Sequence, residues 1–146
     1  MDIILRKDSD FILLERRGHE PFTGRLVIPG GHVDYGETVE EAVLRELMEE
    51  CSVKGELEGI LGVYSDPRRD PRGQRISTVF IGNWISGEPK AGDDAASVQW
   101  STLQDVENLI KSGELAFDHS KILGDYLKFF KNHNKPRNQT FWSTKK

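Results

Sequence analysis

The chain has 146 residues, with 20 Lys+Arg against 24 Asp+Glu and a formal net charge of −4. This length suits one domain with a real core, and the mild acidity argues against a general nucleic-acid binder. The single cysteine, Cys51, excludes an intramolecular disulfide and any multi-cysteine metal site. The apolar runs are too short for a membrane helix and no secretory signal opens the chain, so we expect a cytoplasmic protein.

The first third of the chain predicts a β-hairpin, a short strand and a helix. Two apolar runs, residues 3–5 and 11–14, flank a polar turn, which is typical of a hairpin. Residues 26–28 form a third apolar run, stopped by a Pro-Gly-Gly turn. Residues 38–51 contain no Gly or Pro and are rich in helix formers, so we expect a helix there.

The middle of the chain predicts strands around an unusual loop. Residues 60–64 and 76–85 are rich in β-branched and aromatic side chains, and a Pro/Arg/Asp loop over 66–73 separates them. Residues 98–100 form one more short strand candidate. Strands mixed with a few helices indicate an α/β layered domain.

Two helices and a tail complete the prediction. Ser101 is the expected N-cap of a short helix that ends at residue 110, and residues 119–131 form an amphipathic helix. Residues 1–131 then make a single domain. Residues 132–146 are polar and basic, and we expect much of this C-terminal tail to be loosely ordered.

Three carboxylates gather on the helix predicted over residues 38–51. At about 100° per residue, Glu46, Glu49 and Glu50 fall in one arc within about a turn and a half. Beside them lies the stripe expected to face the core: Val43, Leu44, Leu47, Met48 and Cys51.

The acidic arc has two interpretations. It is either a solvated acidic face or a cation site, because Arg45 cannot neutralise all three acids and a divalent ion would relieve their repulsion. Oxygen-only carboxylate sites suit Mg²⁺ or Mn²⁺. The loop ahead of the helix, residues 29–37, is rich in glycine and is called the Gly-rich loop below. Its glycines permit the close approach of a ligand to the backbone.

The spacing of these residues resembles the Nudix box of hydrolases that act on nucleoside diphosphates linked to another moiety. Gly31 is followed after five residues by Glu37, and after seven more by the run from Arg45 through Glu46 to Glu49 and Glu50. The resemblance implies a Nudix-like α/β/α sandwich with a mixed β-sheet. Ser52 stands where the family usually has Gly, which most simply serves as a left-handed helix C-cap.

The resemblance also implies roles for these residues in the attack of water on a pyrophosphate phosphorus. Glu46, Glu49 and Glu50 would bind Mg²⁺ or Mn²⁺, with the Gly31 carbonyl as an extra ligand. Glu37 and Arg45 would form a salt bridge that holds the loop against the helix. Glu50, or an acid from a later loop, would orient the attacking water.

The loop over residues 66–73 offers groups for a substrate. Arg68, Arg69 and Arg72 can bind phosphate oxygens bidentately, and Asp70 can accept from ribose hydroxyls. The alternative is a surface turn with internal salt bridges. Aromatic side chains at Phe22, Tyr35 and Phe117 could stack on a base, although each is more often a packing residue.

Residues 65–73 resemble the corresponding loop of microbial ADP-ribose pyrophosphatases of the Nudix family, and the likeness extends over about residues 3–130. It implies conversion of ADP-ribose to AMP and ribose 5-phosphate. The substrate-binding residues would be Arg17, Phe22, Arg68, Arg69, Asp70 and Arg72. Ser97 departs from the pattern, because a Glu that is a candidate base or metal ligand is common there.

Two other functions stay open. The first is a MutT-like pyrophosphohydrolase of (deoxy)nucleoside triphosphates, and the second is a non-catalytic module that senses ADP-ribose. The expected partner is a small nucleotide, with neither nucleic acid nor a membrane. A homodimer is possible, since related pyrophosphatases are commonly dimers.

Overall fold

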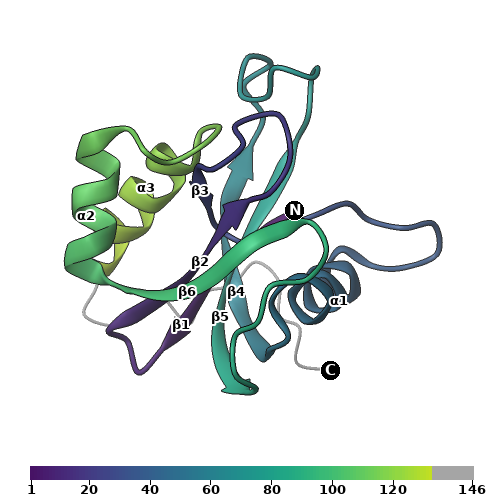
Figure 1. Ribbon diagram of the computed structural model, residues 1–146, viewed down its shortest axis with the longest axis horizontal. Coiled ribbons are helices and arrows are strands. Elements are labelled where there is room, and N and C mark those ends of the chain that lie inside the picture. Colours follow the sequence, from purple (N-terminus) through teal and green to yellow (C-terminus); the bar gives the residue numbers. More distant parts are fainter. Residues whose placement is uncertain (133–146) are drawn as a thin grey trace.

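The computed structural model describes residues 1–132, which fold into a mixed sheet between helices (Figure 1). The strands are β1 (Asp2–Lys7), β2 (Phe11–Arg17), β3 (Leu26–Val27), β4 (Lys54–Tyr64), β5 (Ser77–Ser86) and β6 (Ala95–Thr102). The helices are α1 (Val39–Cys51), α2 (Leu103–Ser112) and α3 (His119–Asn132). Within residues 1–132, no helix combines the length and apolar character needed to cross a membrane. The tail predicted over 132–146 lies, after Asn132, outside the described residues.

The sheet is mixed because β1 pairs with β5 in parallel and every other pairing among its named strands is antiparallel. The strand order is β3-β2-β1-β5-β4, and β6 pairs with β2. The turn between β1 and β2 places Asp8 and Ser9 at φ 54° and 62°, the paired left-handed conformation that tight hairpins favour. The predicted hairpin is therefore confirmed.

The helices cover opposite faces of the sheet, with α1 on one side and α2 and α3 on the other (Figure 1). On the α1 side, Val43, Leu47 and Cys51 pack against strand residues that include Leu13 and Phe80. On the other side the buried cluster comprises residues of β1, β2, β3, β5 and both α2 and α3. This arrangement confirms the predicted α/β/α sandwich.

Several predicted boundaries were wrong. β4 begins at Lys54 rather than residue 60, because pairing with β5 extends it through a stretch rich in Gly and Glu. Thr102, not Ser101, is the N-cap of α2, and it forms a capping box with Asp105. Met48 was expected in the core but is 41% exposed.

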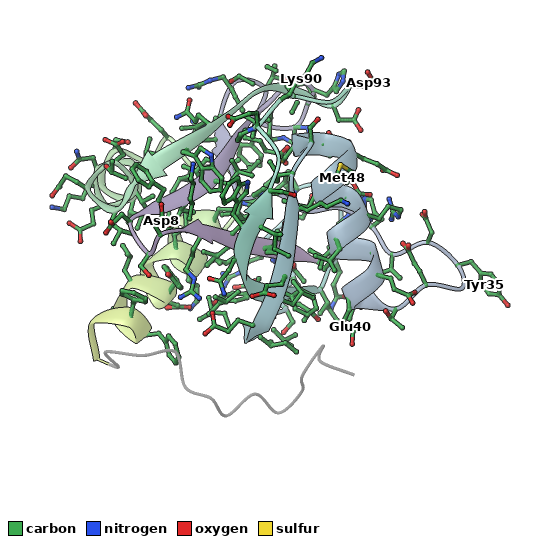
Figure 2. The ribbon with its side chains drawn as sticks, turned by 90° about the horizontal axis from the view of Figure 1, so that it is seen from below. Asp8, Tyr35, Glu40, Met48, Lys90 and Asp93 are labelled. Carbon is green, nitrogen blue, oxygen red and sulfur yellow. The ribbon has the colours of Figure 1, made fainter. Side chains whose placement is uncertain are left out.

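The loop between β3 and α1 projects from the body of the domain. Tyr35 lies at its tip and is fully exposed (Figure 2). α1 begins behind this loop with the N-cap Thr38, which forms a capping box with Glu41. The helix ends at Cys51, and its C-cap Ser52 has φ 61° and ψ 28°, so the left-handed C-cap expected at this position is present.

Candidate functional site

A cleft of about 830 Å³, called the main cleft below, opens beside the start of the Gly-rich loop. It brings together residues from β2, α1, the β4–β5 loop, the segment before β6 and the start of α3. Its charged lining comprises Asp2, Glu15, Arg17, Glu20, Glu46, Glu50, Arg69, Asp70, Arg72, Arg75 and Asp94. The lining therefore combines carboxylates with arginines.

The three glutamates predicted as metal ligands do not all face the main cleft. Glu46 and Glu50 line it, whereas Glu49 does not and has a side chain that is 55% exposed. As they stand, the His, Cys, Asp and Glu side chains of residues 1–132 form no group of three ready to coordinate a metal ion. A cation at this site would require these side chains to reorient.

Arg45 is the cation that Glu37, Glu46 and Glu49 share. Its guanidinium donates to both oxygens of Glu37, at 2.7 and 3.0 Å, so the expected salt bridge is present. It also donates to Glu46 at 3.0 Å and to Glu49 at 3.1 Å. These bonds lower the pKa of Glu37 and raise that of Arg45. Arg45 thus fastens the loop to α1 and partly neutralises its acidic face.

Gly31 lies directly against the carboxylate of Glu46. A Cβ added to Gly31 would overlap that carboxylate, so a larger residue at this position would displace the Glu46 side chain. The Gly31 carbonyl, predicted as a metal ligand, accepts a hydrogen bond of 3.1 Å from the α-amino group of Met1. The backbone of Gly31 and the Glu46 carboxylate therefore lie side by side.

Glu50 is a carboxylate whose charge is poorly balanced. Burial raises its pKa, and Asp94 and Glu46 add to the rise through like-charge repulsion. The Asp94 backbone N–H bonds to this carboxylate, but Oε2 is buried without a hydrogen-bond partner in the described part of the chain. A carboxylate oxygen without a hydrogen-bond partner can coordinate a divalent cation. The residues present therefore fit such an ion.

Glu15 adds a carboxylate that the sequence did not predict for this site. Burial is the main cause that raises its pKa to about 8, and repulsion from Glu50 is the next. Asp2 and Glu46 act in the same direction, whereas Arg17 opposes them. The acidic side of the main cleft therefore extends from α1 to β2.

The basic side of the main cleft is built around Phe117. The guanidinium carbons of Arg17 and Arg72 lie 4.9 and 5.4 Å from the centre of its ring. Burial lowers the pKa of Arg17, and repulsion from Arg72 lowers it further. Two arginines held together in this way form a site for an anion, because bound phosphate would offset their repulsion.

The acids of the β4–β5 loop pair with its arginines, as the alternative interpretation of the loop required. Asp70 is almost fully buried and accepts two hydrogen bonds from the Arg72 guanidinium, which lower the pKa of Asp70 to about 2. Arg68 pairs with Asp66 in the same turn, and its side chain is 89% exposed. Arg72 and Asp70 line the main cleft, but Arg68 does not.

Arg69 connects the loop to α3. Its guanidinium donates to both carboxylate oxygens of Asp118, at 2.8 and 2.9 Å, and both side chains are largely buried. The pairing makes Asp118 an anchor for the loop.

A second hollow of about 800 Å³ adjoins the main cleft and shares Arg69 and Phe117 with it. Phe22 and Arg68 line this hollow and not the main cleft. Phe22 packs edge-on against Phe117, with ring centroids 4.9 Å apart. Both residues have positive φ, 61° and 52°, a strained conformation that is often kept at ligand sites. Tyr35 lines neither hollow.

His119 supports the floor of the main cleft. It is buried, and its Nδ1 accepts a hydrogen bond of 3.1 Å from the Ile28 backbone N–H. Burial lowers its pKa, which favours the neutral ring. Nε2 then carries the proton and points to Asp2 at 3.8 Å. His119 therefore positions the strand that leads into the Gly-rich loop.

Five of the charged residues that line the main cleft have no role in the sequence-based prediction: Asp2, Glu15, Glu20, Arg75 and Asp94. All but Asp2 lie within residues 3–130, over which the resemblance extends, yet nothing in their spacing along the chain shows which way a side chain points. Arg75 lies just beyond Gly73, where the loop predicted to hold the substrate ends. Strand pairing and loop conformation decide these placements.

Comparison with known proteins was consistent with this geometry. The family model described as NUDIX domain matches residues 1–126. An ADP-ribose pyrophosphatase of Methanocaldococcus jannaschii is 49% identical over 129 residues, which span 88% of this chain and 72% of that protein. A putative 8-oxo-dGTP diphosphatase of Bacillus subtilis is 34% identical over 99 residues, which span 67% of this chain and 62% of the relative.

Two solved structures share the fold. The NUDIX domain of Shewanella oneidensis NrtR, complexed with ADP ribose, aligns with a TM-score of 0.74 at 27% identity and covers 87% of this chain and 84% of that one. A bifunctional NMN adenylyltransferase/ADP ribose pyrophosphatase of Francisella tularensis, complexed with AMP and a Mn ion, has a TM-score of 0.77 at 29% identity. That alignment covers 87% of this chain and 40% of the Francisella chain. The chain therefore belongs to the Nudix family of hydrolases.

Proposed function

We propose that this chain hydrolyses ADP-ribose to AMP and ribose 5-phosphate with the help of a divalent cation, Mg²⁺ or Mn²⁺. The observation that carries the proposal is one cleft in which the carboxylates of Glu46 and Glu50 share a lining with Arg17 and Arg72. A pyrophosphate with a bound cation requires both kinds of group at once. The Methanocaldococcus relative supports the choice of substrate.

Different residues of the cleft bind the phosphates, the base or ribose, and the cation. Arg17 and Arg72 bind the phosphate oxygens, and the Phe22–Phe117 pair provides an apolar surface for a base or ribose at the edge of the cleft. A divalent cation, when bound by Glu46 and Glu50, neutralises charge on the phosphate and lowers the pKa of the attacking water. Arg45 and Glu37 keep the Gly-rich loop in place against these acids.

The bonds that change are those at one phosphorus. The oxygen of water forms a bond to that phosphorus, while the bond between the phosphorus and the bridging oxygen of the pyrophosphate breaks. AMP and ribose 5-phosphate then separate. Glu50 orients the water and takes up its proton through a carboxylate oxygen that the cation leaves free. Other acids of the cleft, such as Asp94, lie close enough to Glu50 to influence this step electrostatically.

The substitution Glu50→Gln tests the proposal. We expect AMP release from ADP-ribose to fall by a factor of about 100 or more, the usual contribution of an acid–base group. Far-UV circular dichroism should be unchanged, since the amide keeps the shape of the side chain. The matched control is Glu88→Gln, an exposed acid outside the main cleft, which should retain wild-type turnover. Wild-type turnover in Glu50→Gln would remove Glu50 from this role.

A second candidate is hydrolysis of nucleoside triphosphates, which the Bacillus subtilis relative favours. A panel of ADP-ribose, other nucleoside diphosphate sugars and (deoxy)nucleoside triphosphates separates the two activities. Turnover of triphosphates alone would replace the first proposal. Binding of ADP-ribose without turnover would instead indicate a sensing module. The cytoplasmic location and the homodimer remain predictions.

A further inference from the structure

Ser97 occupies the position where the resemblance led us to expect a carboxylate, and the sheet shows which way it points. Val98 and Trp100 of β6 pack into the cluster on the α1 side. Because side chains alternate along a strand, Ser97 lies on the opposite face, away from the acids of α1. A Glu at residue 97 on this backbone would therefore also point away from Glu46 and Glu50.

The neighbouring strand places a carboxylate on the correct face. Leu13 of β2 packs in the α1-side cluster, so Glu15, two residues later, projects on that same side. Across the ladder, Glu15 pairs with Val98, which is the residue next to Ser97. Glu15 also lines the main cleft together with Glu46 and Glu50. It arrives from the sheet, whereas those two arrive from the helix.

The surroundings of Glu15 disfavour a bare negative charge. Its side chain is partly withdrawn from water and is repelled by Glu50, Asp2 and Glu46. Arg17 is the cation that acts on it most, but the Arg17 guanidinium lies over Phe117 and its Nε donates to the Pro21 carbonyl at 2.6 Å. Among residues 1–132 we find no hydrogen bond or ion pair to the Glu15 carboxylate. Glu15 and the unpartnered Oε2 of Glu50 therefore both lack a counter-charge.

We propose that Glu15 is an additional ligand of the divalent cation, holding it from β2 together with Glu46 and Glu50 from α1. This inference rests on the proposed function insofar as a cation binds at α1. Glu15 then supplies a carboxylate from the sheet that faces the acids of α1. Carboxylates from both β2 and α1 surround an ion more completely than those of α1 alone. On α1, Glu49 and one oxygen of Glu46 already accept hydrogen bonds from Arg45.

The test measures binding of Mn²⁺ alone, without nucleotide, by isothermal titration calorimetry and by the electron paramagnetic resonance signal of the free ion. We expect Glu15→Gln to weaken Mn²⁺ binding by a factor of about 10 or more, as loss of a ligand or of its close support does. Glu88→Gln, an exposed acid outside the cleft, should bind Mn²⁺ like the wild type. Glu15→Asp keeps the charge on a shorter arm and should fall between wild type and Glu15→Gln.

Thermal unfolding gives a second measurement that distinguishes a ligand from a structural residue. Without metal, Glu15→Gln should melt at or above the wild-type temperature, because the substitution removes a crowded carboxylate. With saturating Mn²⁺, the rise in melting temperature should be smaller in Glu15→Gln than in the wild type. A lower melting temperature of the metal-free variant would assign Glu15 to the fold and overturn the proposal.

Other outcomes separate this inference from the proposed function. Wild-type Mn²⁺ affinity in Glu15→Gln overturns the inference, even if turnover falls. A protein that binds Mn²⁺ through Glu15 but leaves ADP-ribose intact supports the inference and contradicts the proposed substrate. A wild-type protein that does not bind Mn²⁺ contradicts both.

Discussion

At the scale of single residues, Ser52 after the end of α1 is held in an unfavourable backbone conformation. Ser52 adopts the left-handed conformation that an L-residue with a Cβ enters with difficulty. Its hydroxyl recovers only one long contact, 3.3 Å to the Lys90 carbonyl. Gly113 holds the same position after α2, at φ 75° and ψ 19°, without that cost.

We therefore predict that Ser52→Gly raises the free energy of unfolding by about 0.5–1 kcal/mol. The reverse change at the other helix, Gly113→Ser, should lower it by a similar amount, because open space around Gly113 leaves conformation as the cause. Urea denaturation followed by circular dichroism measures both. A loss of stability in Ser52→Gly would mean that the hydroxyl contact outweighs the backbone strain.

At the scale of elements, one ion pair joins the β4–β5 loop to the start of α3. The side chains of Arg69 and Asp118 are only 7% and 17% exposed. A buried pair of this kind contributes little net stability, whereas either partner left alone is costly. The loop that presents Arg72 and Asp70 to the main cleft is thus attached to α3 by a pair whose members depend on each other.

A double-mutant cycle tests this attachment. Asp118→Leu should lower the free energy of unfolding by about 3–5 kcal/mol, because it leaves Arg69 charged and unpaired in a buried place. Adding Arg69→Met should recover a large part of that loss. Urea unfolding of the wild type, both single variants and the double variant gives the coupling energy. Additive losses would show that the two side chains are stabilised by other contacts.

At the scale of the whole molecule, the net negative charge belongs to one region. Residues 37–50 carry six acids and one arginine, so α1 and its lead-in account for the charge of the chain. The fold sets this acidic helix across the main cleft from the arginines of β2 and the β4–β5 loop. Carboxylates that are paired with arginines lose their contribution to stability when acid protonates them.

The pair of Asp70 and Arg72 should appear in the stability of the molecule toward acid. The folded pKa of Asp70 is about 2, below the unfolded value, so its contribution is complete above about pH 4 and is lost as the pH falls toward 2. Asp70→Asn should lower the free energy of unfolding by on the order of 2 kcal/mol at pH 7. The difference from the wild type should shrink between pH 4 and pH 2 in urea titrations. A difference independent of pH would exclude this pair as its source.

The sequence by itself determined what depends on neighbours along the chain. The spacing of Glu46, Glu49 and Glu50 and the left-handed cap at Ser52 follow from the geometry of one helix, and the polar turn between β1 and β2 follows from its own residues. Only the tertiary structure decided that Glu15 and Asp94 join Glu50 and that Asp118 pairs with Arg69. These contacts depend on strand pairing and on the packing of distant loops, for which no short stretch of sequence carries a signal.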